Sequence, residues 1–159
     1  MSDPLVLASH LPDEGHYQSD LYKVWSVLCD GDLAYSQGIA KHWDHPAPLV
    51  LIEHDVEVTD AHITRLLECN YPICAQSYPL HWITTGHVVD EYPHKNNGIP
   101  VTYGTEWADW SAPGFIKISP ESRIAPLAEC HWRHVEQAIN DAVTGPVHIH
   151  WPPVPHHHF

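Results

Sequence analysis

The sequence predicts an α/β fold in three layers, with helices covering both faces of a central, mostly parallel sheet. Short apolar runs alternate with amphipathic segments along the chain, as strands alternate with crossover helices in such folds. The run at 49–52, Leu-Val-Leu-Ile, is continuously apolar and indicates a strand buried on both faces. Neither an internal repeat nor a linker divides the 159 residues, so we expect one domain spanning 1–159.

The first half is expected to supply two strands and two helices. The apolar stretch at 5–9 predicts the first strand. Ser19 can cap a helix, and the following apolar residues have helical spacing: Leu21, Val24, Trp25 and Leu28. A second short helix is expected at 33–41, before the strand at 49–52.

The second half is expected to continue the alternation around a long irregular middle. Thr59 is predicted to cap a helix whose apolar positions are Ile63, Leu66 and Leu67. Residues 78–113 are rich in Gly, Pro, His, Asn and Trp without a sustained period, which predicts long functional loops. The remaining expected elements are strands at 71–76, 114–118 and 147–151 and a helix at 131–143.

Charge and hydropathy exclude several kinds of partner. The formal net charge is −13, from seven Lys and Arg against twenty Asp and Glu, so we do not expect extensive contact with duplex nucleic acid. Apolar stretches are too short to span a bilayer, and the first residues lack the basic region of a signal peptide. The sequence therefore predicts a soluble, cytoplasmic protein without membrane contact.

The four cysteines are too few and too scattered to predict a disulfide scaffold. Cys69 and Cys74 have a spacing that zinc sites use, but no second cysteine pair lies near them in the sequence. The favoured interpretation is reduced, structural cysteines, as expected in the cytosol, and metal binding by Cys69 and Cys74 stays open.

An acidic motif follows the apolar strand directly. Glu53, Asp55 and Glu57 occupy alternate positions, so on an extended backbone their side chains point the same way. The carboxyl end of a central strand is where ligands bind in open α/β sheets. Clustered carboxylates repel one another, and a bound cation is the usual compensation. Asp55 is the first candidate ligand and Glu57 the next; alternatively, Asp55 is an acid near the start of the helix that Thr59 caps.

A second group of candidate ligands lies near the end of the chain. His148 and His150 are two apart on a predicted strand and share one face of it, which suits a common cation. The alternative is a polar strand face turned to solvent. Three further histidines at 156–158 are interpreted as the native end of the chain rather than as a tag.

With these residues the chain resembles the GT-A glycosyltransferases, in particular the family 2-like enzymes and their small phage and actinobacterial members. The segment 49–57 is similar to their apolar strand and acid-x-acid motif, and His148-Ile149-His150 stands where a further metal ligand of the family would be expected. The resemblance implies a Rossmann-like GT-A-type domain. Its N-terminal half is shortened, because Ser9 and Asp55 lie too close in sequence for the usual βα units.

The resemblance also implies an activity. Such enzymes move a sugar from a nucleotide-sugar donor, here expected to be of UDP type, to an acceptor that the sequence does not identify. Mn²⁺ or Mg²⁺ would be held by Asp55 and Glu57 together with His148 and His150. Ser9 and His10 at the end of the first strand, with Glu53 and Asp55, would contact the donor.

A base that accepts the proton of the acceptor is expected in the middle segment. Glu106 and Asp109 lie beside Trp107 and Trp110, and in related inverting enzymes an acid of this region serves as the base. The alternative is that both are surface acids on a loop anchored by tryptophan.

Two other functions stay open on the sequence. The chain can be a non-catalytic metal- or sugar-binding relative that has lost the donor pocket. It can also be a metal-dependent hydrolase or oxygenase in which His148, His150 and Asp55 form a site of two histidines and one carboxylate.

Overall fold

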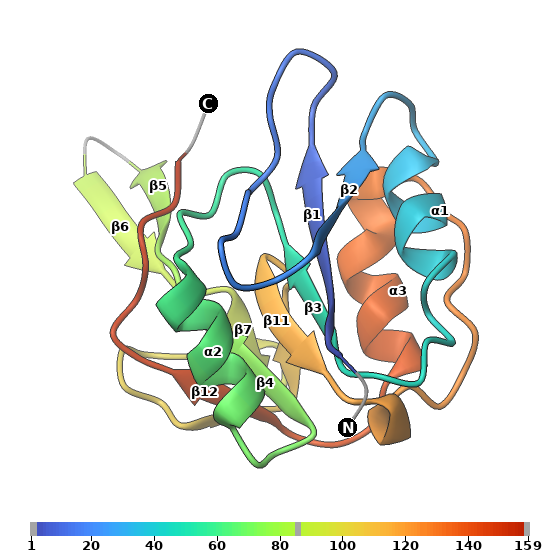
Figure 1. The fold of residues 1–159 in the computed structure, drawn as a ribbon. Coiled ribbons are helices and arrows are strands. Elements are labelled where there is room, and N and C mark those ends of the chain that lie inside the picture. The colour runs from blue at the N-terminus through green and yellow to red at the C-terminus, as the bar shows by residue number, and fades with distance from the viewer. Residues whose placement is uncertain (1–2, 85–86, 158–159) are drawn as a thin grey trace.

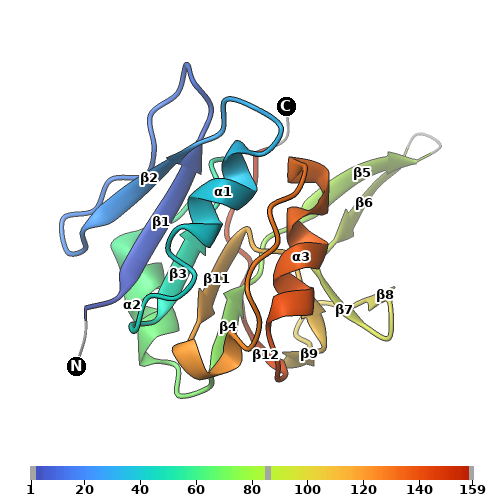
Figure 2. The same cartoon turned by 90° about the vertical axis from the view of Figure 1, so that its right-hand side faces the viewer.

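A computed structural model describes residues 3–84 and 87–157 of the chain. Its centre is a seven-stranded sheet in the order β2-β1-β3-β11-β4-β12-β9. Helices α1 (Ala34–Ala40) and α3 (Val135–Ala142) lie on one face of this sheet, and α2 (Asp60–Glu68) lies on the other (Figures 1 and 2).

The strands of the large sheet are short. They are β1 (Leu5–His10), β2 (Val24–Leu28), β3 (Leu49–Ile52), β4 (Ile73–Gln76), β9 (Trp107–Ala108), β11 (Phe115–Ile118) and β12 (Val147–His150). Two small sheets lie beyond the edge of it that β12 and β9 form (Figure 2): β5 (Leu80–Thr84) with β6 (His87–Glu91), and β10 (Trp110–Ser111), β7 (His94–Asn96) and β8 (Ile99–Pro100). Single 3₁₀ turns are formed by Pro120–Ser122 and Trp132–His134.

The predicted mostly parallel, Rossmann-like sheet of a GT-A-type domain is wrong, because the observed sheet is mixed. Strand β1 is parallel to β2 and β3, and β12 is parallel to β4. Strand β11, however, is antiparallel to both of its neighbours, and β9 is antiparallel to β12. Both small sheets are antiparallel, so antiparallel pairings outnumber parallel ones in the described chain. Between β4 and β11 the chain passes through hairpins instead of a crossover helix, and only a crossover would force a parallel return.

Two other expectations about individual elements are also wrong. The segment after Ser19 forms a turn followed by β2, not a helix; the Ser19 hydroxyl accepts hydrogen bonds from the backbone N–H groups of Leu21 and Tyr22. Pairing with β1 overrides the helical spacing of these apolar residues, most of which are exposed. The expected loops of the middle segment contain the short strands β5 to β10.

The other predicted elements are confirmed, and Thr59 caps α2 as expected.

The core explains why the strands read as continuous apolar runs. Along β1 and β3, alternate residues pack in different layers. Leu5, Leu7, Leu49 and Leu51 belong to the layer on the side of α1 and α3, whereas Val6, Ala8, Val50 and Ile52 belong to the layer on the side of α2. Within the described ranges, no helix has both the length and the apolar character needed to cross a membrane.

A close backbone contact sets the position of the end of β3. Gly114 lies directly before β11, and its carbonyl accepts a hydrogen bond of 2.8 Å from the Glu53 N–H. A Cβ atom at Gly114 would lie 2.1 Å from the Tyr78 hydroxyl oxygen, and Tyr78 is buried. The absence of a side chain at Gly114 therefore allows Tyr78 to pack against the backbone that holds Glu53.

Replacing this glycine tests the contact. Gly114→Ala should lower the free energy of unfolding by about 1–3 kcal/mol, as overpacking of a filled core does. Urea denaturation measures the change. Gly15→Ala is the matched control, because a Cβ there meets nothing within 4 Å, and it should stay within about 0.5 kcal/mol of the wild type. Equal losses in both variants would contradict the role given to the Tyr78 contact.

Candidate functional site

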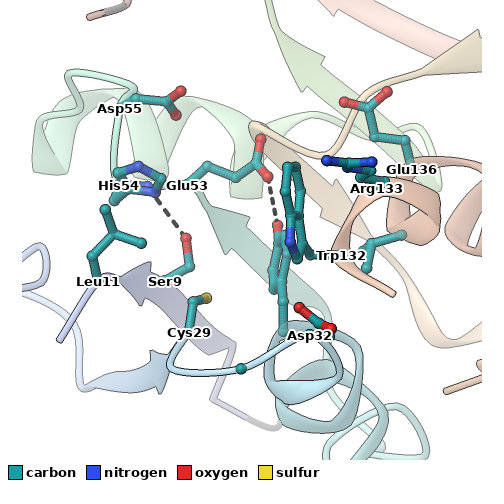
Figure 3. A pocket seen from close by; sticks show the side chains of 13 residues that line it. Ser9, Leu11, Cys29, Asp32, Glu53, His54, Asp55, Trp132, Arg133 and Glu136 are labelled. Atoms are coloured by element: carbon teal, nitrogen blue, oxygen red, sulfur yellow. Dashed lines mark hydrogen bonds between the residues drawn. The ribbon is translucent and has the colours of Figure 1, made fainter. Parts of the chain in front are cut away.

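A cavity of about 690 Å³ opens where β1, β2 and β3 end (Figure 3). Ser9 from β1, Cys29 just after β2 and Glu53 just after β3 all line it. The opposite side is formed by α1 and by the segment that begins α3, with Tyr35, Trp132 and Glu136. The cavity therefore lies at the carboxyl ends of parallel strands, the usual position of a ligand site in an open α/β sheet.

A second cavity of about 410 Å³ adjoins the first one. Tyr78, Lys95 and Trp110 are among the residues that line it. Three carboxylate residues line both cavities: Glu53, Asp55 and Glu136. Figure 3 shows these side chains coming from two different elements, the turn after β3 and helix α3. The boundary between the two cavities is thus acidic.

Asp55 is paired with a histidine from the end of the chain. The Nε2 atom of His156 lies 2.9 Å from the Asp55 Oδ2 atom, and the exposed fractions of the two side chains are 6% and 26%. Burial acts to raise the pKa of Asp55, but the hydrogen bond and charge of His156 outweigh it, so the pKa of Asp55 lies below its ordinary value. Asp55 is therefore an ionised carboxylate at the boundary of the two cavities.

The C-terminal segment reaches Asp55 by pairing with the acidic turn. Val56 and His156 form an antiparallel bridge. The His157 N–H donates to the Asp55 carbonyl oxygen at 2.7 Å, and the Glu57 N–H donates to the Pro155 carbonyl oxygen at 2.9 Å. In Figure 1 this segment, coloured dark red, rises from β12 towards the end of the sheet where β1 ends.

Glu53 is held in a different environment from Asp55. The Tyr35 hydroxyl donates to the Glu53 Oε2 atom at 2.8 Å, one of the dashed contacts in Figure 3. Burial, together with the nearby charge of Asp55, raises the pKa of Glu53 from 4.5 to about 7. The Glu136 side chain keeps contact with solvent, but the protein atoms around its carboxyl still raise its pKa, and the charge of Lys95 opposes this shift. The carboxyls of Glu53 and Glu136 therefore favour the protonated, uncharged form more than the carboxyl of Asp55 does.

The first strand supplies one of its two predicted residues to the cavity. Ser9 is buried, lines the larger cavity, and accepts a hydrogen bond of 3.2 Å from the His54 N–H through its hydroxyl oxygen. His10 is instead engaged locally, with its Nδ1 atom 3.0 Å from the Leu11 carbonyl oxygen and 3.2 Å from that of Glu14. His10 is not among the described residues that line either cavity.

The structure does not bring His148 and His150 to the acidic turn. Their strand, β12, is separated from β3 by β11 and β4. The imidazole that faces Asp55 belongs to His156, a residue that the sequence analysis noted only as part of the chain end. Glu57 is exposed, and its Oε2 atom lies 3.4 Å from the His157 Nε2 atom. Of the four predicted metal ligands, only Asp55 therefore lies at the boundary of the cavities.

His148 and His150 gather instead with two cysteines. The potential ligand atoms of Cys69, Cys74, His148 and His150 all lie within 4.8 Å of one another. Cys69 and Cys74 are joined by a disulfide, so the expectation that all cysteines are reduced is wrong for this pair. Cys29 and Cys130 are free.

The two predicted candidates for the base lie elsewhere in the fold. Glu106 is exposed and its Oε1 atom lies 3.2 Å from the His148 Nε2 atom. Asp109 is also exposed; its Oδ2 atom accepts a hydrogen bond from the Asn97 N–H, and its own N–H donates to the Asn96 Oδ1 atom. Neither acid is among the described lining residues of the two cavities.

Sequence reasoning missed Tyr35, Glu136 and His156. Tyr35 and Glu136 lie on helices that were predicted, but nothing in their spacing distinguishes a cavity residue from a solvent-facing one. A usable signal existed only for His156, because three consecutive histidines after a proline-rich segment are an uncommon concentration of potential ligands.

Comparisons with known proteins add little to this geometry. No protein-family model matches the sequence, and no curated protein matches it significantly. Among solved structures, the fold is similar to the crystal structure of A197 from STIV, with a TM-score of 0.49 and 11% sequence identity. The match covers 94% of this chain and 82% of that chain. A likeness this weak carries no argument about function, which must come from the site.

The raised pKa of Glu53 predicts a pH-dependent stability. The folded protein holds the Glu53 proton more tightly than the unfolded chain, so the wild type should lose stability as the pH rises from 4.5 to about 7. Glu53→Gln removes this titration and can still accept the hydrogen bond from Tyr35. Its free energy of unfolding, relative to the wild type, should therefore increase across this pH range.

Denaturation at a series of pH values measures the difference. Glu57→Gln is the control, because it makes the same substitution at an exposed carboxylate of the same turn. If the free energies of unfolding of the wild type and of Glu53→Gln differ by the same amount at every pH, the raised pKa assigned to Glu53 is contradicted.

Proposed function

We propose that the protein is a metal-dependent glycosyltransferase that moves a sugar from a nucleotide-sugar donor to an acceptor. The observation that carries this proposal is the meeting of two cavities at Glu53, Asp55 and Glu136. A group transfer needs two substrates on either side of the reacting atoms, and this arrangement offers a separate space for each. The acidic boundary is the place where the sugar would pass from one to the other.

The larger cavity is suited to the donor. Its volume falls within the range of small-molecule sites, about 300–1,000 Å³. Trp132 is half exposed there and offers an aromatic surface for a nucleobase. Arg133, whose guanidinium lies 5.3 Å from the Trp132 ring centre, lines the same cavity and is the side chain best suited to pair with phosphate oxygens. These features favour a nucleotide of UDP type as the first ligand to test.

Asp55 and His156 are suited to hold the divalent cation. Carboxylate oxygen and imidazole nitrogen are ligands that Mn²⁺ accepts readily, and Mg²⁺ is commonly held by one or two carboxylates together with substrate phosphates. The remaining ligands would then come from the donor diphosphate and water. When bound, such a cation would neutralise charge that develops on the leaving diphosphate. In this proposal His156 takes the place that the sequence analysis gave to His148 and His150.

Glu136 is the best-placed candidate for the base. It faces both cavities, and the protein atoms around its carboxyl raise its pKa above the ordinary value, which makes its carboxylate a stronger base. The acceptor would enter the smaller cavity, which Lys95 and Trp110 line. Glu136 therefore replaces Glu106 and Asp109 in this role.

Donor binding is the first test. Calorimetry with UDP in the presence of Mn²⁺ should detect binding to the wild type. Asp55→Asn should weaken it by at least about tenfold, or about 1.4 kcal/mol, because a charged ligand to the cation is lost. The matched control is Glu57→Gln, which removes an exposed carboxylate of the same motif and should leave the affinity unchanged. If neither UDP nor any nucleotide sugar binds the wild type at millimolar concentration, the proposal fails.

Turnover separates an enzyme from a binding protein. Glu136→Gln should lower the rate of sugar transfer by about 10²–10⁴-fold with little change in donor affinity, since a base acts in the transition state. Asp109→Asn, which alters a carboxylate outside both cavities, should keep the wild-type rate. Donor binding without hydrolysis or transfer by the wild type would instead support the non-catalytic, sugar-binding alternative.

A further inference from the structure

Four potential metal ligands converge at a place that the proposed transferase site does not use. Cys69 follows the last residue of α2, Cys74 is the second residue of β4, and His148 and His150 lie on β12. Their ligand atoms all lie within 4.8 Å of one another. None of these four described residues lines either of the two cavities around Asp55.

The sheet itself creates this convergence. Strands β4 and β12 are parallel neighbours, and His148 lies opposite Cys74 in their register. Since side chains alternate along a strand, His150 projects from the same face as His148. Cys74 is fully buried, whereas the exposed fraction of the His148 side chain is 18%. The group thus lies at the sheet surface beneath the end of α2, mostly shielded from water.

The two imidazoles are arranged as metal ligands commonly are. The His148 Nδ1 atom lies 3.6 Å from the Cys69 Sγ atom, and its Nε2 atom lies 3.2 Å from the Glu106 Oε1 atom. An imidazole with one nitrogen directed at the site and the other at a carboxylate is the usual arrangement of a histidine that binds zinc. The Nε2 atom of His150 is buried and has no hydrogen-bond partner among the described residues. Buried nitrogens are rarely left unpaired, so this atom is available to a ligand.

The segment between the two cysteines is fixed by a buried lysine. Lys117 on β11 donates from its Nζ atom to the carbonyl oxygens of Cys69 and Tyr71, at 2.7 and 2.8 Å. The rings of Tyr71 and Trp107 pack against the His148 ring, with centres 4.7 and 4.8 Å away. The backbone and the imidazole are therefore held in place by groups that would not themselves bind the ion.

We propose that Cys69, Cys74, His148 and His150 bind one Zn²⁺ when the two cysteines are reduced. Two thiolates and two imidazoles in a compact group are a ligand set typical of tetrahedral structural zinc, and four residues between the cysteines is a spacing found in such sites. Glu106 would be a positioning residue that orients His148. This proposal does not rest on the proposed transferase activity; the role of the ion would be to join the end of α2 to β4 and β12.

The disulfide between Cys69 and Cys74 is the oxidised form of the same site. Two equivalents of a small thiol reduce it to two protein thiols and leave the reagent as its own disulfide. The two thiols then each lose a proton when their sulfur atoms bind Zn²⁺. Removal of two electrons from the bound thiolates by a disulfide oxidant would restore the protein disulfide and release the ion.

Cobalt titration of the full chain tests the site. The protein is reduced with excess thiol, freed of reductant without oxygen, and titrated with Co²⁺, which absorbs visibly in a tetrahedral thiolate site. We expect one Co²⁺ per chain and its displacement by Zn²⁺. His150→Gln and the double variant Cys69→Ser/Cys74→Ser should lose the absorption. His134→Gln and Cys29→Ser/Cys130→Ser are the matched controls, and both should retain it.

A further variant and a measurement on the wild type complete the test. Glu106→Gln should keep the cobalt spectrum but bind Zn²⁺ about 10–100-fold more weakly, as loss of a carboxylate behind a ligating histidine does. In the reduced wild type, Zn²⁺ should protect Cys69 and Cys74, but not Cys29 and Cys130, from alkylation followed by mass spectrometry. Because it uses the wild type, this measurement tests zinc binding by Cys69 and Cys74 even where a ligand variant does not fold.

Three results would overturn the proposal. They are a disulfide that excess thiol does not reduce in the folded protein, a reduced wild type without the thiolate absorption, and protection by Zn²⁺ that is equal for all four cysteines.

Discussion

The antiparallel strand β11 is the element on which both candidate sites depend. It lies between β3 and β4 and pairs with each of them. Just before it, the Gly114 carbonyl holds the backbone of Glu53 at the boundary of the two cavities. Within it, Lys117 reaches the loop between Cys69 and Cys74 and satisfies two of its carbonyl groups. A buried, cationic side chain is tolerated there because it is hydrogen-bonded to both.

The acidic turn after β3 is stable because its carboxylates are not equivalent. Asp55 stays charged beside His156, whereas burial and the charge of Asp55 favour the protonated form of Glu53, which the Tyr35 hydroxyl contacts. If both were ionised, the carboxylates of Glu53 and Asp55, two residues apart in one partly buried turn, would repel each other. Because their pKa values differ, the two carboxyls are suited to different roles. Asp55 is suited to bind a cation, and Glu53 is suited to hold or release a proton near neutral pH.

The sequence predicted those parts of the fold that local pattern determines. The strand at 49–52, the capped helix after Thr59 and the strand at 147–151 follow from apolar runs, capping chemistry and alternation. The direction of β11 could not be predicted, because direction depends on how the chain returns through a segment without periodicity. The segment after Ser19 misled for a related reason: its apolar residues have helical spacing, yet pairing with β1 makes it a strand.

For the candidate sites, the sequence identified suitable ligands but combined them wrongly. His148 and His150 were grouped with Asp55 because the resemblance to GT-A glycosyltransferases implies a further metal ligand near the end of the chain, whereas the strand order separates them from Asp55. The segment between β12 and His156 connects the proposed zinc site, which includes β12, with the acidic turn, where His156 contacts Asp55. Trp151 donates to the Thr105 carbonyl, Gln76 donates to the Pro152 carbonyl, and the Val154 N–H donates to the Ser77 carbonyl. These contacts fix the segment along its length, so anchoring β12 at the proposed zinc site also anchors the path by which His156 is delivered to Asp55.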